Sequence, residues 1–167
     1  LMQYKFDAKN RPFIREEFLK LSQQAIEENN PDLIIWPETI TASQNLIFKA
    51  FMRKLTTISK QTNTAFIFGT PRKKANKYYN SAALIKENQT IIYDKQQLVP
   101  FGEYWPFKNV FKFFGLSNII PGSEFSKGQS NTIFNIGSLS YGITICLEST
   151  TPKQIQSYDD NNINGFI

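Results

Sequence analysis

Three reactive side chains each follow a short apolar run in this 167-residue chain: Glu38, Lys95 and Cys146. Short apolar runs are typical of strands buried on both faces of a sheet. Ligands bind at the carboxyl ends of strands in open α/β sheets, so the three side chains are expected to share that edge. A thiol, a carboxylate and an ammonium gathered there would suit nucleophilic acyl transfer.

Each of these residues alone also fits a structural position. A cysteine at the end of a strand is often a small buried hydrophobe. The glutamate after Trp36-Pro37 could be a turn carboxylate, and the lysine could be an ordinary charge at the end of a strand. Only their joint occurrence, together with their neighbours, indicates a site.

The chain contains no histidine, which excludes Ser-His, Cys-His and histidine-metal mechanisms. Catalysis must therefore use carboxylates, lysine, tyrosine and cysteine, and we expect no cofactor and no metal. The single cysteine excludes an internal disulfide.

Composition favours one globular domain. Apolar residues make up 41% of the chain and aromatic residues 14%, enough for a sizeable core. The net charge of +5 is mostly scattered, and the densest basic run, residues 72–77, lacks the interleaved aromatics of single-strand binders. We therefore expect a solvated loop there and no nucleic-acid partner, with a membrane-surface contact as the alternative. No apolar stretch reaches the ~18 residues of a membrane span, and no signal peptide is expected.

The spacing of apolar residues predicts the elements that hold these side chains. Helices are expected at 12–30, 45–61 and 152–160, and strands at 33–36, 65–68, 79–85, 90–93, 132–136, 139–145 and 164–167. In the first helix, Ile14, Phe18, Leu21 and Ala25 predict the buried face. The order of elements predicts an α/β layered sandwich. The irregular segment 95–121, rich in aromatics, is expected to be a mobile lid over the site, with Glu103 turned inward.

Four segments carry a resemblance to a known family: 31–39, 79–82, 93–104 and 142–149. A Trp-Pro-Glu sequence, a lysine at a strand end and Ile-Cys-x-Glu, in that order, resemble the nitrilase superfamily of carbon-nitrogen hydrolases. Within it, the string Lys-x-x-Leu-Val-Pro-Phe-Gly-Glu-Tyr resembles the catalytic domain of apolipoprotein N-acyltransferases.

The resemblance implies a Glu-Lys-Cys triad. Cys146 is then the nucleophile, Glu38 the general base and Lys95 the cation that stabilises the oxyanion. Glu103 becomes an orienting carboxylate beside the lysine, and Glu148 a supporting carboxylate in the same pocket. A cysteine is only a few per cent thiolate at its free pKa, and without histidine a carboxylate is the remaining good base.

Residues near this triad are expected to contact the substrate: Phe101, Tyr104, Trp105 and Leu147. The family commonly has tyrosine where this chain has Leu147. An aromatic ring there would help to shape the acyl pocket, so this departure bears on chain-length preference.

The resemblance further implies a nitrilase-like α-β-β-α layered sandwich over residues 1–167, truncated at its C-terminal side. Family members continue through further strands and carry a multi-span membrane domain before the catalytic domain. The implied location is the inner (cytoplasmic) membrane, with the catalytic domain on the periplasmic face. The implied partners are a phospholipid acyl donor, a lipoprotein N-terminus as acceptor, and the membrane surface through the missing membrane domain.

Three functions remain open from the sequence. The first is acyl transfer from a phospholipid, through a cysteine thioester, to the N-terminal amine of an apolipoprotein. The second is a soluble carbon-nitrogen hydrolase, an amidase with the same triad in which water replaces the amine. The third is an inactive truncated remnant.

Overall fold

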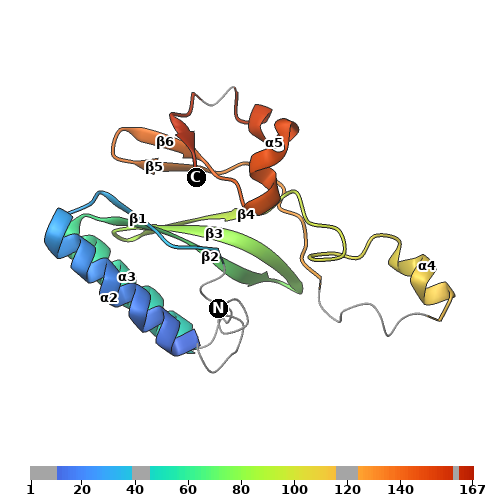
Figure 1. Ribbon diagram of the computed structural model, residues 1–167, viewed down its shortest axis with the longest axis horizontal. Helices are drawn as coiled ribbons and strands as arrows, with labels where there is room; N and C mark the ends of the chain where they lie inside the picture. The colour runs from blue at the N-terminus through green and yellow to red at the C-terminus, as the bar shows by residue number, and fades with distance from the viewer. Residues whose placement is uncertain (1–10, 39–45, 116–123, 160–161) are drawn as a thin grey trace.

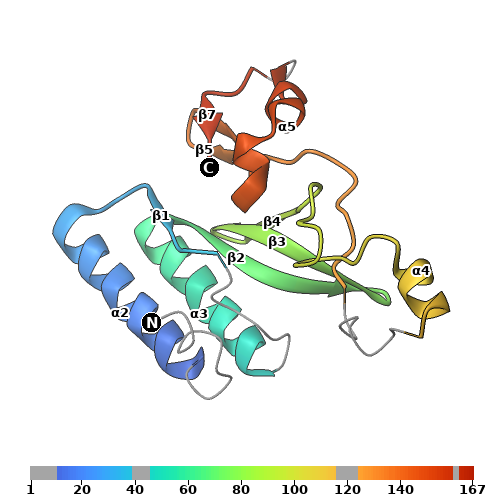
Figure 2. The same cartoon turned by 45° about the vertical axis from the view of Figure 1, so that its right-hand side comes forward.

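The helices and two sheets of this chain form successive layers of the fold (Figure 1). The computed structural model describes residues 11–38, 46–115, 124–159 and 162–167. Two long helices cover one face of a four-stranded sheet, and a three-stranded sheet covers its other face (Figure 2). A short helix lies beside the second sheet. The predicted α/β layered sandwich is confirmed.

The elements have the following bounds. The helical layer contains α2 (Arg11–Asn29) and α3 (Leu46–Thr62). The first sheet, in spatial order, contains β1 (Leu33–Ile35), β2 (Ala65–Lys74), β3 (Lys77–Lys86) and β4 (Gln89–Asp94). The second contains β5 (Ile133–Ile136), β6 (Leu139–Gly142) and β7 (Gly165–Phe166). Three short helices complete the described chain: α4 (Lys108–Phe113), η2 (Cys146–Thr150) and α5 (Pro152–Gln156).

Strand direction brings distant residues to one edge of the first sheet. β1 is parallel to β2, and β2 and β4 are each antiparallel to β3. The carboxyl ends of β1 and β4 therefore meet at the edge where β3 begins. Glu38 follows β1 there and Lys95 follows β4, while Asn80 lies near the start of β3, opposite Pro71.

A buried indole fixes the segment that carries Glu38. Trp36 is 4% exposed and its Nε1 donates to Ser22 Oγ of α2 at 3.0 Å. Its ring centroid lies 5.5–6.1 Å from four phenylalanine rings of the helices and β2: Phe18, Phe51, Phe66 and Phe68. The glutamate two residues later therefore follows a side chain that is packed in the core.

The space between the two sheets is filled by a second apolar cluster. The first sheet contributes Ala65, Ile67, Ala82, Leu84 and Tyr93. The second sheet and the chain after β6 contribute Phe134, Ile136, Ile143 and Ile145. Because Ile145 is buried here, the position of Cys146 depends on how the sheets pack.

The expected buried face of the first helix is partly wrong. Leu21 is 55% exposed, whereas Arg15, Leu19 and Ser22 are buried. Ser22 belongs on the buried face because the indole N–H of Trp36 needs an acceptor there.

The strands at residues 65–86 are longer than expected. Pro71 does not end β2, and the basic run is not a loop: Arg72–Lys74 completes β2 and Lys77 begins β3. Among the described residues, β1 ends opposite Ile67, so β2 has an unpaired edge at Pro71. Proline is tolerated at such an edge because no ladder partner needs its missing N–H.

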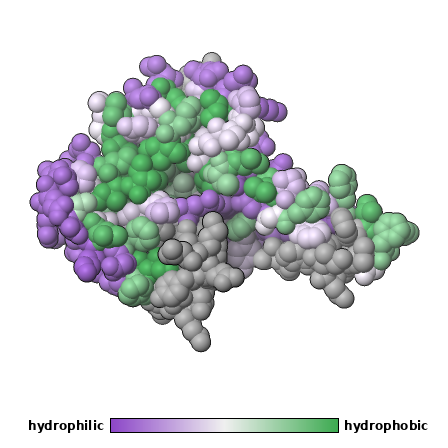
Figure 3. Space-filling model, in the orientation of Figure 1, coloured by the Kyte–Doolittle hydropathy of each residue, from purple (hydrophilic) through white to green (hydrophobic). Residues whose placement is uncertain are grey.

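Within the irregular segment 95–121, the helix α4 projects from the sheets in both views (Figure 1, Figure 2). Apolar side chains gather at the tip of this projection (Figure 3). Phe107, Val110, Phe113 and Phe114 around α4 are all at least half exposed. In its described part, the segment therefore does not cover the mouth of the site as expected; residues 116–121 lie outside the described ranges.

Candidate active site

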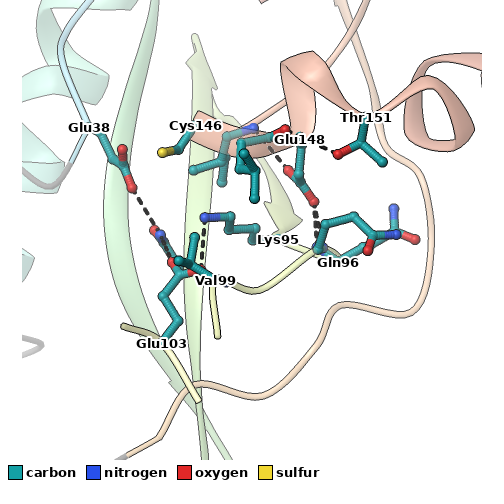
Figure 4. A network of polar contacts seen from close by, with 12 residues as sticks. Glu38, Lys95, Gln96, Val99, Glu103, Cys146, Glu148 and Thr151 are labelled. Carbon is teal, nitrogen blue, oxygen red and sulfur yellow. Dashed lines mark hydrogen bonds and ion pairs between the residues drawn. The ribbon is translucent and has the colours of Figure 1, made fainter. Parts of the chain in front are cut away.

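A chain of hydrogen bonds joins the side chains at the edge of the first sheet (Figure 4). Asn80 Nδ2 donates to Glu38 Oε1 at 3.0 Å and to Glu103 Oε1 at 2.7 Å. The other oxygen of Glu103, Oε2, accepts from Lys95 Nζ at 2.8 Å and from the backbone N–H of Val99 at 2.8 Å. Side chains from the segment after β1, from β3 and from the segment after β4 are thereby fixed relative to one another.

The Glu103–Lys95 pair is shielded from solvent. The lysine side chain is 1% exposed and that of Glu103 is 13% exposed. Burial alone would raise the pKa of the Glu103 carboxyl, but hydrogen bonds from Lys95, Asn80 and the Val99 N–H together hold that pKa below its ordinary value. Glu103 is therefore ionised at neutral pH and keeps a counter-charge beside the ammonium.

Cys146 occupies a strained corner of the backbone. It follows the extended residue Ile145 and has φ of +54°, in the left-handed region that costs a residue with a Cβ roughly 1–2 kcal/mol. It is the first residue of η2, and its side chain is exposed. In Figure 4 its sulfur points into the space between Glu38 and Lys95. Backbone strain of this kind is typical of functional sites.

Glu148 holds the cysteine corner in place from behind. It is fully buried, and its Oε2 accepts from the N–H of Ile145 at 2.9 Å. Its Oε1 accepts from Tyr93 Oη at 2.9 Å and from the N–H groups of Gln96 and Gln97 at 2.7 and 2.9 Å. One carboxylate thus ties the segment before Cys146 to the segment after Lys95.

Further buried polar groups extend this tether. Gln154 Nε2 of α5 donates to Tyr93 Oη at 3.2 Å and to Asn131 Oδ1 at 3.4 Å. Gln96 Nε2 donates to the same Asn131 oxygen at 2.7 Å. Burial, with the charge of Glu148 next in size, raises the pKa of Tyr93 far above its ordinary value, so its hydroxyl remains a donor.

A cavity of about 170 Å³ opens beside Cys146, between the two sheets. Glu38 and Cys146 both line it, and most of its wall is apolar: Ile35, Trp36, Ile67, Phe68, Ala82, Ile143, Ile145 and Ile167. The exposure of Ile35, 53%, corrects the expectation that its strand is buried on both faces. β1 is an edge strand, and this side chain faces the cavity.

In the described part of the chain, no three His, Cys, Asp or Glu side chains gather as potential metal ligands. Of the helices in the same ranges, none combines the length and apolar character that crossing a bilayer requires.

A comparison with protein families shows to which family this chain belongs. The model of the carbon-nitrogen hydrolase family matches residues 3–164, nearly the whole chain. The chain belongs to the carbon-nitrogen hydrolase family. The resemblance carried by the Trp-Pro-Glu, lysine and Ile-Cys-x-Glu elements is thus confirmed.

Curated proteins are similar to it over part of their length. An apolipoprotein N-acyltransferase of Allorhizobium ampelinum is 32% identical over 164 residues, covering 90% of this chain and 31% of the relative. Another, of Rhizobium leguminosarum, is 34% identical over 176 residues, covering 95% of this chain and 32% of the relative. The chain spans about a third of the length of these curated relatives.

Solved structures share the fold at low identity. An amidase of the nitrilase superfamily from Nesterenkonia has a TM-score of 0.62 and 16% identity, covering 91% of this chain and 58% of the amidase. A glutamine-dependent NAD+ synthetase from Acinetobacter baumannii has a TM-score of 0.65 and 19% identity, covering 93% of this chain and 28% of the synthetase. The α/β sandwich of this carbon-nitrogen hydrolase is therefore the nitrilase fold.

The predicted site residues of this family member fall into two groups: those that meet near the cysteine, and those that lie away from the cavity. Glu38, Lys95, Glu103 and Cys146 lie together, and the expected contact between Glu103 and Lys95 is present. Lys95 is buried and is not among the residues that line the cavity.

The expected substrate contacts lie outside the cavity wall. Phe101, Tyr104 and Trp105 belong to the turn around Glu103, and Phe101 packs edge-on against Trp105 with centroids 5.5 Å apart. Leu147 follows the cysteine and is 46% exposed. Glu148 does not line the cavity either, because its oxygens face backbone N–H groups.

Asn80 is a site residue to which sequence reasoning gave no role. It lies in the segment 79–82 that carries the family resemblance, and with Ser81 it interrupts the aromatic and apolar residues of β3. Its partners are 42 and 23 positions away, so only the folded chain shows what it contacts.

Proposed function

We propose that this chain is the catalytic part of an acyltransferase that moves an acyl group from a phospholipid to the N-terminal amine of an apolipoprotein. The observation that carries the proposal is the arrangement of Cys146, in a strained and exposed corner, opposite Glu38 and beside a shielded Lys95–Glu103 pair. The names of the relatives supply the substrate classes.

In the first half-reaction, Glu38 takes the thiol proton of Cys146 and the sulfur attacks the ester carbonyl of the donor. A C–S bond forms, and the carbonyl oxygen gains negative charge. Lys95 and the N–H of Leu147 are the donors proposed for that oxyanion, each typically worth about 3–4 kcal/mol. The C–O bond then breaks, and the leaving lysophospholipid alkoxide takes the proton from Glu38.

In the second half-reaction, the amine of the acceptor attacks the thioester. A C–N bond forms and the C–S bond breaks. Glu38 removes a proton from the attacking amine and returns one to the sulfur of Cys146, which regenerates the thiol. Glu103 remains ionised throughout, because its pKa is lowered, and its bond to Nζ holds Lys95 in place.

The projection around α4 supports a lipid surface as the place of this reaction. Exposed apolar groups of this density either pack on another surface or meet lipid. Phe107 and Phe113 are 77% and 85% exposed, and Lys108 lies between them in the sequence. We place the catalytic domain at the inner membrane, on its periplasmic face, by resemblance to the family.

One observation favours an amidase as the second candidate. The cavity beside Cys146, about 170 Å³, holds a small amide more readily than a long acyl chain. The same side chains would then form an acyl-cysteine from an amide, release ammonia, and pass the acyl group to water.

Intact-mass spectrometry separates these functions, because Cys146 is the only cysteine of the chain. The protein is incubated with vesicles of phosphatidylethanolamine and phosphatidylglycerol. Wild type should gain the mass of one acyl group, and Cys146→Ser should gain none, because a hydroxyl is a far poorer nucleophile when the base is a carboxylate. A lipopeptide with a free N-terminal amine should then remove the adduct.

Ammonia release from small aliphatic amides is the matched measurement. Release without any acyl adduct from the vesicles would assign the chain to the amidases. Equal adducts on wild type and Cys146→Ser would exclude the thioester mechanism, and a protein inactive in both assays would be the remnant.

A further inference from the structure

One side chain touches both carboxylates of the candidate site. Asn80 Nδ2 lies 3.0 Å from Glu38 Oε1 and 2.7 Å from Glu103 Oε1. The backbone oxygen of the same residue accepts from the N–H of Lys95 at 2.8 Å. Asn80 is 7% exposed, so few water molecules can replace these contacts.

The chemistry of the amide fixes its orientation. A carboxylate oxygen accepts hydrogen bonds, so the NH2 group of Asn80, rather than its carbonyl, must face Glu38 and Glu103. An amide NH2 has two hydrogens, and each carboxylate receives one. The amide neither gains nor loses a proton near neutral pH, so it cannot carry a proton between the two acids.

Two carboxylates this close would otherwise interact directly. Both oxygens lie within 3.0 Å of one nitrogen atom, and neighbouring carboxylates tend to share a single proton, which raises the apparent pKa of one of them. A shared proton would neutralise either Glu38, the proposed base, or Glu103, the counter-charge of Lys95.

We propose that Asn80 is a positioning residue that keeps Glu38 available as the base for Cys146 by donating one hydrogen bond to it and one to Glu103. The proposal rests on the function proposed above, in which Glu38 is the base. The charged side chains that contact Asn80 are Glu38 from the segment after β1 and Glu103 from the turn after β4. Lys95 contacts Asn80 through its backbone N–H and pairs its Nζ with Glu103.

Alkylation of the single cysteine provides a test that needs no natural substrate. The rate at which iodoacetamide modifies Cys146 is measured from pH 5 to pH 10 in the 167-residue chain, with intact mass as the readout. Asn80→Asp keeps the shape of the side chain but replaces the donors with an acceptor and adds a negative charge. Asn80→Ala removes the donors without adding charge.

Both variants should slow alkylation at neutral pH by about ten- to a hundred-fold, the effect expected for losing a hydrogen bond to a charged group. The midpoint of the rise in rate should move to higher pH, and further in Asn80→Asp. The matched control is Asn135→Asp, which adds the same charge at an exposed position of β5. It should behave as wild type.

Glu38→Gln separates failure of this inference from failure of the proposed function. If Glu38→Gln alkylates like wild type, Glu38 is not the base and the proposed function fails. If Glu38→Gln is slow while both Asn80 variants match wild type, only the inference about Asn80 fails. Slow alkylation at an unchanged pH midpoint would reduce Asn80 to a structural residue and overturn the proposal.

Discussion

Replacing Glu148 with glutamine tests whether this carboxylate is the tether of the cysteine corner. Its Oε1 accepts three hydrogen bonds and its Oε2 accepts one, from Ile145. Glutamine has nearly the same shape but only one oxygen. If that oxygen faces the three donors, the new NH2 group meets the N–H of Ile145, and two donors face each other in a fully buried place.

The magnitude follows from these contacts. One hydrogen bond to a charged group is lost, at about 1.5–3 kcal/mol, and a buried donor is left unpaired. The remaining three bonds weaken because they are no longer charge-assisted. A neutral amide costs less to bury than a carboxylate, which offsets part of the loss. We expect Glu148→Gln to lower the free energy of unfolding by about 2–3 kcal/mol, or the melting temperature by roughly 4–12 °C.

Urea unfolding, followed by tryptophan fluorescence and circular dichroism, measures this change. The control is Glu16→Gln, since Glu16 is 72% exposed and lies 3.7 Å from Lys54. Exposed pairs of this kind contribute at most about 1 kcal/mol. Tyr93→Phe removes one of the donors to Glu148, and the double variant with Glu148→Gln should deviate from additivity by at least about 0.5 kcal/mol.

Two results would refute the tether. Glu148→Gln could unfold at the same urea concentration as Glu16→Gln, or the effects of Tyr93→Phe and Glu148→Gln could be additive. Either would mean that the four hydrogen bonds do not hold the two segments together.

Two further predictions concern the backbone and the charge of the site. Cys146→Gly should be about 1 kcal/mol more stable to urea than Cys146→Ala, because glycine adopts a φ of +54° without strain; equal stability would show that the corner relaxes. The lowered pKa of Glu103 stabilises the fold above its unfolded value of 4.5, and this contribution is lost as pH falls through the lower folded value. The stability difference between wild type and Glu103→Gln should therefore shrink below about pH 4.5; a difference that grows there would contradict the ion pair.

Local sequence patterns predicted much of the fold because most elements depend on nearby residues. The two long helices and the hairpin of β3 and β4 were expected within one or two residues of their bounds. Glu38 and Lys95 were expected at one edge because each follows an apolar run, and the directions of β1 and β4 place them there.

Patterns failed where a distant partner decides the outcome. The exposure of Leu21 could not be foreseen, because α2 buries Ser22 to satisfy Trp36, 14 residues away. Pro71 lies inside a strand only because the edge of β2 is unpaired there in the described chain. Asn80 has both partners in loops that a strand pattern cannot locate.

The carboxylates of Glu103 and Glu148 have different roles because their partners differ. Glu103 accepts hydrogen bonds from Lys95 and Asn80, so it supplies the negative charge beside the lysine. Glu148 accepts only from neutral donors, three of them backbone N–H groups, so it fixes the distance between the segment before Cys146 and the segment after Lys95.

The strain at Cys146 needs such a tether, because a left-handed residue relaxes unless the surrounding structure holds it. The bond from Ile145 to Glu148 acts on the residue immediately before the strained one. Loosening Glu148 should therefore disturb the direction of the sulfur before it disturbs the Glu38–Asn80–Glu103 chain, which is built on the other sheet.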